Sequence, residues 1–220
     1  MGTEQYWHGI LPHSGVPGRS YNEIKALIQK VKPLMKEING TLPKAKVGIV
    51  FSYAQGHAIT IQPHHPELRY VDHLLTYYKD LYRRNIMVDF VQETDDFSQY
   101  DVLIAPLQYL MSRELENKYK DYVKNGGQLV MTMRTGVKET NNISMIDQPL
   151  PGNLSEVLGV EVHEYDCLRD VNVKINWDQQ EYTATKWADI ITLISAKSLA
   201  TYGSEFYEGS PAITYNQFGK

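Results

Sequence analysis

Short runs of apolar residues alternate with amphipathic stretches over the first two thirds of the chain. The runs at 46–52, 86–91, 101–106 and 128–133 are typical of strands buried on both faces. Apolar residues recur every three to four positions in the stretches between them, which predicts helices over 20–38, 67–85 and 112–125. Residues 53–66 are expected to form a loop.

Local signals mark the ends of the predicted helices. The first opens on a Ser-x-x-Glu capping box, Ser20 to Glu23, and contains Pro33, which should kink or break it. The third is expected to begin after Ser112 as N-cap and to close at Gly126, a residue suited to the left-handed C-cap conformation.

Strands that alternate with helices of this length predict right-handed crossovers and a parallel sheet covered on both faces. The expected fold is therefore an α/β fold of the flavodoxin-like, class I glutamine amidotransferase-like type, a doubly wound parallel sheet whose core spans about 45–135. Beyond Thr135 the pattern changes to period two between turn residues, which predicts a C-terminal β-meander over about 160–220. Residues 187–194 fit either a helix or a strand.

Composition narrows the possible partners and compartments. With 22 Lys and Arg against 26 Asp and Glu, the net charge of −4 argues against nucleic acid or an anionic membrane as a partner. The single cysteine, Cys167, requires no oxidising compartment, and no apolar run reaches the length of a membrane span, so a cytoplasmic location is expected. Aromatic residues close to both ends suggest a segment cut from a longer polypeptide, or ends that dock on the domain.

Parallel sheets bind ligands at the carboxyl ends of their strands, so the loops after Phe51, Val91, Pro106 and Met133 are the places where a site is expected. The loop after Phe51 lacks the glycine-rich cradle of a phosphate site. Cys167 has no glycine beside it to permit a nucleophile's sharp turn, so an inert thiol is favoured.

Two polar clusters are candidate sites. His64, His65 and Glu67 could ligate a metal, yet adjacent histidines in an extended segment point in opposite directions, so a loop leading into a helix is favoured and no metal or cofactor is expected. Asp95 and Asp96 are interpreted as a solvated turn.

The N-terminal run Glu4 to His13 combines a carboxylate, two aromatic rings and two imidazoles. Sugar sites use such groups, with ring faces against C–H surfaces and charged groups bound to hydroxyls. From composition alone, an aromatic arm docked on the domain is the simpler interpretation.

Several long segments resemble, in order, the family-42 glycoside hydrolases, which are β-galactosidases. These segments are EQYWHGILPHSGVPGRSYNEI, LRYVDHLLTYYKDLYRRNIMVDFV, YDVLIAPLQYLMS, YVKNGGQLVMTMRTGVKETNN and LATYGSEFYEGSPAITYNQFGK. The resemblance places 1–20 at the end of the catalytic barrel domain and its linker, and 21–220 in the middle, trimerisation domain.

The resemblance implies a retaining hydrolase of terminal β-D-galactosyl residues, such as those of lactose, whose two catalytic glutamates lie upstream of this chain. It implies no catalytic residue here and an inactive isolated chain. Glu4 and His8 match the family's galactose-contacting glutamate and histidine. The implied partners are two further copies, arranged as a homotrimer, and the galactoside bound by the parent's barrel. The alternative is a free-standing flavodoxin-like or amidotransferase-like domain that binds a small molecule.

Overall fold

The computed structural model describes residues 9–219, and its contacts divide the chain into two compact units, Met1–Pro43 and Lys44–Lys220. The described part of the first unit contains one helix, α1 (Arg19–Ile38). Its N-cap is Gly18, with no side-chain cap, so the predicted capping box is wrong. Ser20 lies inside the helix, and Glu23 instead accepts two 2.8 Å hydrogen bonds from Arg19. The helix is not broken at Pro33: no residue of α1 is buried, so water can reach the carbonyl left without a partner.

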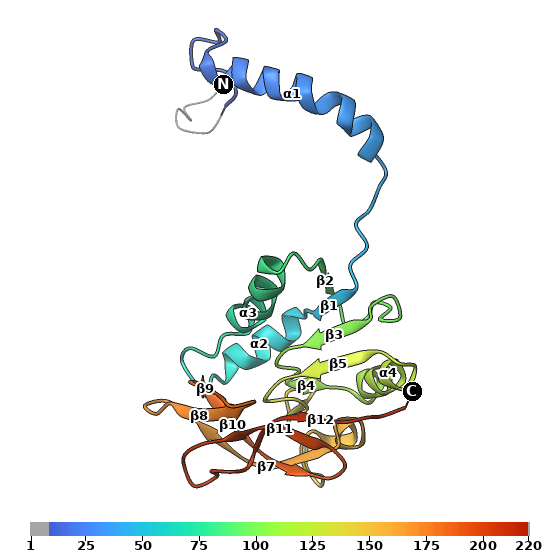
Figure 1. Cartoon of the computed structure of the whole chain (residues 1–220), viewed down its shortest axis with the longest axis vertical. Helices are drawn as coiled ribbons and strands as arrows, with labels where there is room; N and C mark the ends of the chain where they lie inside the picture. The colour runs from blue at the N-terminus through green and yellow to red at the C-terminus, as the bar shows by residue number, and fades with distance from the viewer. Residues whose placement is uncertain (1–8, 220) are drawn as a thin grey trace. The chain divides into compact units, whose positions relative to one another are not determined.

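The second unit is built on a four-stranded parallel sheet (Figure 1). Its strands are β1 (Val47–Val50), β2 (Val88–Val91), β3 (Val102–Ala105) and β5 (Gln128–Met131), in the order β2-β1-β3-β5. In register, Ile49 lies between Phe90 and Ile104. All four strands expected from the apolar runs are confirmed, each two or three residues shorter than expected. Burial on both faces is wrong for β2 and β5, which lie at the edges of the sheet and are partly exposed.

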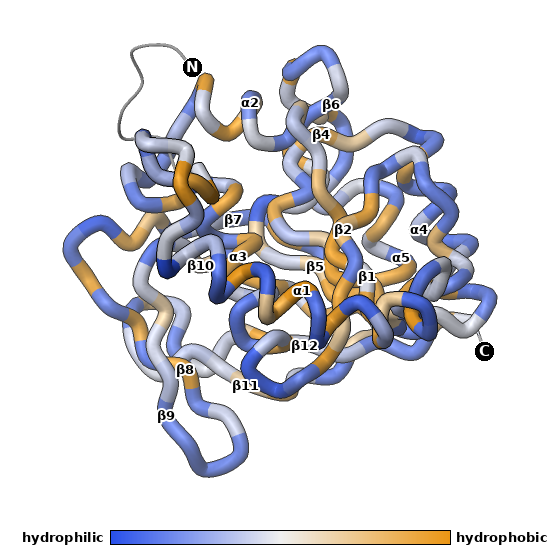
Figure 2. Tube along the Cα trace, turned by 90° about the horizontal axis from the view of Figure 1, so that it is seen from above, coloured by the Kyte–Doolittle hydropathy of each residue, from blue (hydrophilic) through white to orange (hydrophobic). Residues whose placement is uncertain are grey.

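Helices cover both faces of this sheet, because alternate strand residues point to opposite sides. Ile49 packs in one cluster with Ala58 of α2 (Tyr53–Ile61) and Leu74 of α3 (Tyr70–Arg83). Val50 packs in the other with Leu115 of α4 (Arg113–Lys124). In Figure 2, which colours the Cα trace by hydropathy, the apolar segments of β1 and β5 lie centrally in the second unit and hydrophilic turns lie around them.

Helix α2 corrects the expectation of a loop over 53–66. Its sequence contains Gly56 and several β-branched residues and lacks a clear apolar stripe, so its local helix signal is weak. Burial of Gln55, Ala58 and Ile59 against the sheet stabilises the helix instead. The signals at α4 are confirmed: the Ser112 side chain accepts from the backbone N–H of Leu115, and Gly126 has φ +101°.

Antiparallel strands follow the parallel sheet. β7 (Val160–Cys167) pairs with β10 (Trp187–Leu193), so the undecided segment 187–194 is a strand over 187–193. β12 (Pro211–Tyr215), β11 (Lys197–Tyr202), β8 (Val173–Trp177) and β9 (Gln180–Ala184) form a second sheet in that order. A simple meander is therefore wrong, because β10 leaves its chain neighbour β9 to pair with β7.

Short elements connect these layers. β4 (Leu110–Met111) pairs in parallel with β6 (Lys138–Glu139), and a 3-10 turn, η1 (Gly152–Leu154), leads into α5 (Ser155–Leu158). The result is a mixed α/β unit with one parallel sheet and added antiparallel strands. Among residues 9–219, no helix is both long and apolar enough to cross a membrane.

Candidate functional site

The carboxyl ends of the parallel strands lie along one edge of the sheet, as expected. There Gln55, in the first turn of α2, is 1% exposed. Its Nε2 donates to the carbonyl oxygen of Leu110 at 2.7 Å and to a carboxylate oxygen of Glu93 at 2.8 Å, and its Oε1 accepts from the N–H of Leu110 at 2.7 Å. This one amide therefore joins α2, β4 and the loop after β2.

Arg134 lies in the loop after β5 and has φ +66°. The residue is buried, with 6% of its surface exposed. The guanidinium carbon lies 4.3 Å from the ring centroid of Trp187, 4.9 Å from that of Tyr109 and 5.5 Å from that of Tyr165. Because aromatic faces attract cations, three segments distant in sequence converge on this charge.

Asp189 of β10 binds the same loop. Its Oδ2 accepts from the backbone N–H of Arg134 at 3.1 Å, and its Oδ1 accepts from the indole N–H of Trp187 at 2.8 Å. Burial raises the pKa of the Asp189 carboxyl, and these hydrogen bonds together with the Arg134 charge oppose that rise. The carboxylate connects the parallel sheet to the β7–β10 pair.

A small cavity of about 10 Å³ lies beside Arg134. Its polar lining is provided by Gln62, His64, Tyr109 and Arg134, and the rest of its wall is apolar. The apolar part includes Leu107, which follows the central strand β3 in a strained left-handed backbone conformation with φ +47°. This turn has the sharpness that a nucleophile would need, but leucine carries no nucleophilic atom.

The two adjacent histidines separate, as their extended backbone predicted. The ring of His64 lies edge-on to Trp187, with centroids 5.8 Å apart. His65 is buried, with Nδ1 accepting from the N–H of Glu67 at 3.0 Å and Nε2 3.1 Å from the carbonyl oxygen of Leu168, to which it donates in that tautomer. Within the described residues, no group of three or more His, Cys, Asp or Glu side chains is arranged to hold a metal ion.

Cys167 and the Asp95–Asp96 pair have structural surroundings. The Cys167 thiol is partly buried and donates to the carbonyl oxygen of His64 at 3.1 Å. Asp96 accepts from the N–H and the hydroxyl of Ser98 at 2.9 and 2.8 Å, and these bonds lower the pKa of its carboxyl. Asp95 accepts from the N–H of Gln92 at 2.9 Å, so both aspartates serve a turn.

The predicted substrate contacts Glu4 and His8 lie outside the described residues. The structure brings together other residues that the sequence analysis did not single out, above all Gln55 and Arg134. A signal for Arg134 was available, since it is the first charged residue after the apolar run 128–133, in one of the loops where a site was expected.

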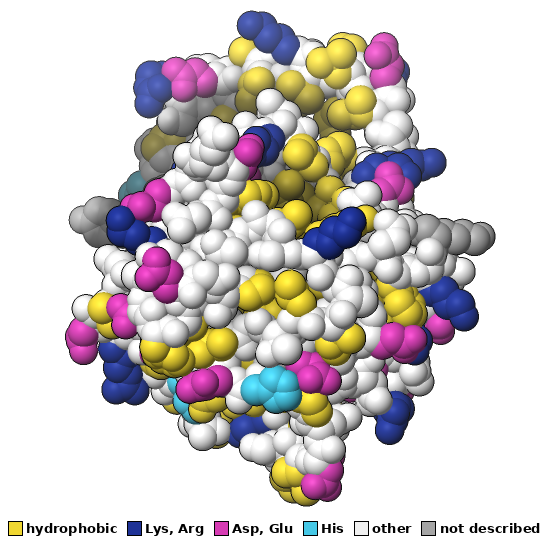
Figure 3. All heavy atoms as spheres, turned by 60° about the horizontal axis from the view of Figure 1, so that its bottom comes forward, with side chains coloured by type: hydrophobic (Ala, Val, Ile, Leu, Met, Phe, Trp, Pro, Cys, Tyr) yellow, Lys and Arg dark blue, Asp and Glu magenta, His cyan; other side chains and the backbone are white. Residues whose placement is uncertain are grey.

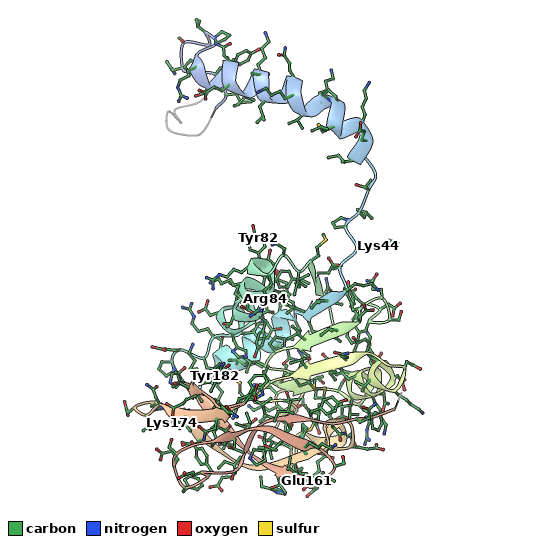
Figure 4. The ribbon with its side chains drawn as sticks, viewed as in Figure 1. Lys44, Tyr82, Arg84, Glu161, Lys174 and Tyr182 are labelled. Atoms are coloured by element: carbon green, nitrogen blue, oxygen red, sulfur yellow. The ribbon has the colours of Figure 1, made fainter. Side chains whose placement is uncertain are left out.

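Aromatic side chains form a surface on α3 and the sheet-edge strand β2, where Tyr82 and Phe90 are exposed and Tyr78 is partly buried. Tyr78 lies between Tyr82, at a centroid distance of 6.0 Å, and Phe90, at 5.4 Å. Tyr82 is 68% exposed and projects from the end of α3 (Figure 4), and Met87 is also exposed. We call Tyr78, Tyr82, Met87 and Phe90 the α3–β2 aromatic surface.

Other apolar side chains are exposed among the C-terminal strands. Figure 3 shows them as separate patches between charged residues. Phe206, in the turn between β11 and β12, is 74% exposed. On the β8–β9 hairpin, where Figure 4 marks Lys174 and Tyr182, Trp177 and Tyr182 are both exposed with ring centroids 6.1 Å apart.

Comparison with known proteins gives consistent matches. The family described as "Beta-galactosidase trimerisation domain" matches residues 45–220. The β-galactosidase BgaA of Clostridium cellulovorans is 34% identical over 221 residues, covering 100% of this chain and 33% of the relative. The β-galactosidase LacZ of Lactobacillus acidophilus is 38% identical over 228 residues, covering 100% of this chain and 33% of that protein.

Solved structures of β-galactosidases also match this chain along nearly its whole length. Gan42B, a GH42 β-galactosidase from G. stearothermophilus, superposes with a TM-score of 0.92 at 29% identity, covering 100% of this chain and 32% of that one. The β-galactosidase from Bacillus circulans sp. alkalophilus superposes with a TM-score of 0.91 at 28% identity, covering 99% and 34%. The chain thus spans about a third of the length of the relatives it matches.

The fold is that of a mixed α/β domain, in which buried polar side chains connect the strand ends and aromatic residues face outward. The chain belongs to the β-galactosidase trimerisation domain family.

Proposed function

We propose that this chain is the non-catalytic assembly domain of a β-galactosidase and that three copies pack around a threefold axis in the parent enzyme. The observation that carries this proposal is the family match over residues 45–220, most of the second compact unit. We assign 21–220 to the trimerisation domain and 1–20 to the end of the catalytic barrel domain and its linker.

The parent enzyme, in this proposal, hydrolyses terminal β-D-galactosyl residues with retention, using two glutamates that belong to the barrel rather than to this chain. The names of the relatives and the one-third coverage of their length support this assignment. Glu4 and His8 would contact galactose only when the barrel holds them in place. The single cysteine, which requires no disulfide-forming compartment, supports a cytoplasmic location.

The strand order supports the finer fold assignment. The parallel order β2-β1-β3-β5 corresponds to the first strands of the flavodoxin-like order, with helices on both faces. We therefore propose a flavodoxin-like, class I glutamine amidotransferase-like core to which the antiparallel strands are added.

The physical basis for assembly is the exposed aromatic area. A closed ring of three copies needs a heterologous contact, in which one surface of a copy packs on a different surface of the next. Aromatic residues are enriched at the cores of such interfaces. The α3–β2 aromatic surface and the turn that carries Phe206 supply two separate apolar surfaces on one copy.

Sedimentation equilibrium of the full 220-residue chain over a wide concentration range tests the assembly. The expected result is a reversible approach to three times 25.3 kDa at high concentration. Tyr82→Asp and Phe206→Asp probe the two apolar surfaces, and each is expected to lower the mass because each disrupts one side of the heterologous contact. A strictly monomeric chain, together with a monomeric barrel-containing parent, would contradict the proposal.

A chromogenic galactoside tests the catalytic assignment. The isolated chain is expected to show no turnover above buffer, and the barrel-containing parent is expected to hydrolyse the substrate. Turnover by the isolated chain would place catalytic groups within these 220 residues and overturn the non-catalytic role.

A further inference from the structure

The chain contains two Asn-Gly pairs, and each lies at the C-terminal end of a helix. Asn39 is the C-cap of α1 and precedes Gly40, and Asn125 is the C-cap of α4 and precedes Gly126. Both glycines have a left-handed backbone, with φ +82° and +101°, as is common where a helix ends. The two pairs therefore share their residues and their position in a helix, and their surroundings can be compared directly.

The pair at the end of α4 is closed by two hydrogen bonds. The N–H of Gly126 donates to the carbonyl oxygen of Val123 at 2.9 Å, and the N–H of Gly127 donates to that of Tyr122 at 3.0 Å. Together these bonds form a Schellman motif. Tyr122 is buried in the core of the second unit, so this helix end is held in place.

The pair at the end of α1 lacks this closure. The N–H of Asn39 donates to the carbonyl oxygen of Met35 at 2.9 Å, and the N–H of Thr41 donates to that of Ile38 at 3.0 Å. Within residues 9–219, the structure gives no hydrogen bond from the N–H of Gly40 or to and from the side-chain amide of Asn39. Both residues are exposed, and a Cβ built on Gly40 would meet no atom within 4 Å apart from its chain neighbours. The Gly40 nitrogen and the Asn39 amide are thus open to water and to each other.

We propose that Asn39 is a site of spontaneous modification, at which the side-chain amide is converted through a cyclic imide to isoaspartate and aspartate. The Gly40 nitrogen loses its proton to hydroxide and attacks the Cγ atom of Asn39. A bond forms between these two atoms, the Cγ–Nδ2 bond breaks, and the leaving nitrogen takes a proton from water and departs as ammonia. Glycine favours this step because it has no Cβ to hinder the approach of its nitrogen.

Water then opens the imide at one of its two carbonyl carbons. Cleavage of the new bond to Cγ gives aspartate, and cleavage of the original peptide bond gives isoaspartate, in which the main chain runs through the former side chain. One water is consumed and one ammonia is released, so the product gains a negative charge. This charge lies at the negative end of the α1 dipole, and isoaspartate lengthens the main chain by the Cβ atom just before the second unit begins. The modification does not depend on the proposed assembly, because a monomeric chain would carry it as well.

Peptide mapping of the full chain, incubated folded in mildly alkaline buffer, tests the site. Trypsin releases Asn39 in the peptide 37–44 and Asn125 in the peptide 125–134, and mass spectrometry after chromatography separates the amide, aspartate and isoaspartate forms. Both products are expected to accumulate at Asn39, faster as pH rises, because the attacking nitrogen must lose its proton. Asn125 is expected to react at least about tenfold more slowly, because two hydrogen bonds must open first.

Asn125 is the matched control within the same chain, and unfolding removes the difference between the two sites. In guanidinium chloride both asparagines are expected to react at comparable rates, since the closure of α4 is lost. Equal rates at the two sites in the folded chain, or no reaction at Asn39, would overturn the proposal. An Asn125 that stays slower by the same factor after unfolding would also overturn it, because neighbouring residues rather than the fold would then set the rate.

Two variants test the chemistry at Asn39. Gly40→Ala adds a Cβ beside the attacking nitrogen, so it is expected to slow the reaction at Asn39 severalfold and to leave the Asn125 rate unchanged. Asn39→Gln is expected to abolish the products at this position, because its longer side chain would have to close a larger ring. Neither variant is expected to unfold the chain, since no residue of α1 is buried, and circular dichroism checks this. A Gly40→Ala chain that reacts at Asn39 as fast as wild type would contradict attack by the Gly40 nitrogen.

Discussion

The side chain of Gln55 and the backbone of Leu110 form a reciprocal pair of 2.7 Å hydrogen bonds, in which the amide both donates to the carbonyl and accepts from the N–H of the same residue. The amide thereby takes the place of a neighbouring strand at β4. Leu110 is buried, so its N–H and carbonyl lose these hydrogen-bond partners inside the protein when the Gln55 side chain is removed.

Gln55→Ala is expected to lower the free energy of unfolding by about 2–5 kcal/mol, because each buried group left unsatisfied costs about 1–3 kcal/mol. Chemical denaturation measured by circular dichroism gives the value. Gln92→Ala, at an exposed position, is the control and should change stability by less than about 0.5 kcal/mol. A Gln55→Ala variant as stable as the control would show that the reciprocal pair contributes little.

Asp189→Asn is expected to destabilise the domain by about 1–3 kcal/mol. An amide has one accepting oxygen, so it can satisfy either the backbone N–H of Arg134 or the indole of Trp187, but not both. Asp166→Asn, on the paired strand β7, is the matched control because its carboxylate accepts one hydrogen bond, from Tyr207 at 2.8 Å, which an amide oxygen can keep. Equal melting temperatures for the two variants would argue against this prediction.

His73→Gln is expected to flatten the dependence of stability on pH. Burial, with a smaller effect of Lys186, lowers the pKa of folded His73 to about 4, whereas the unfolded value is 6.5. Between these values the unfolded chain binds the extra proton, so the contribution of His73 to stability falls as pH drops from 6.5 toward 4. The loss reaches up to about 3 kcal/mol, since one pKa unit corresponds to about 1.4 kcal/mol.

Unfolding free energies of wild type and His73→Gln, measured from pH 7 to pH 4, test the direction of this pH dependence. As pH falls, the free energy of unfolding of the variant should rise relative to that of wild type. His57→Gln, at an exposed histidine of α2, is the control and should run parallel to wild type.

Gly48→Ala is expected to destabilise the domain by about 1–3 kcal/mol through overpacking. A Cβ atom on this residue of β1 would lie 2.9 Å from Cγ2 of Val91 and 3.0 Å from Cδ1 of Leu103, closer than side chains normally pack. Gly18→Ala is the control, because the nearest atom to its added Cβ would be 3.9 Å away. Thermal unfolding should show a clear loss for the first variant and a small change for the second.

Much of the sheet could be predicted because it depends on local features. The central strands β1 and β3 are uninterrupted apolar runs, as a parallel strand buried on both faces requires, and the edge strands β2 and β5 are mostly apolar. Ser112 and Gly126 likewise act on the two ends of their own helix, α4, so the N-cap and the C-terminal end predicted from them are confirmed. Helix α2 was missed because its stability comes from burial of Gln55 and Ile59 against the sheet, which a helix pattern does not record.

By itself, the sequence determined the order of the four parallel strands and of helices α1, α3 and α4, the edge of the sheet where polar residues gather, and the resemblance that led to the family. Only the tertiary structure decided that β10 pairs with β7, and hence that Trp187 and Tyr165 meet Arg134 beside an unpartnered Tyr109 hydroxyl. The physical reason is the distance along the chain over which each interaction acts. Hydrophobic periodicity and capping act within a few residues, whereas the pairing of a buried charge depends on segments that only the folded chain brings together.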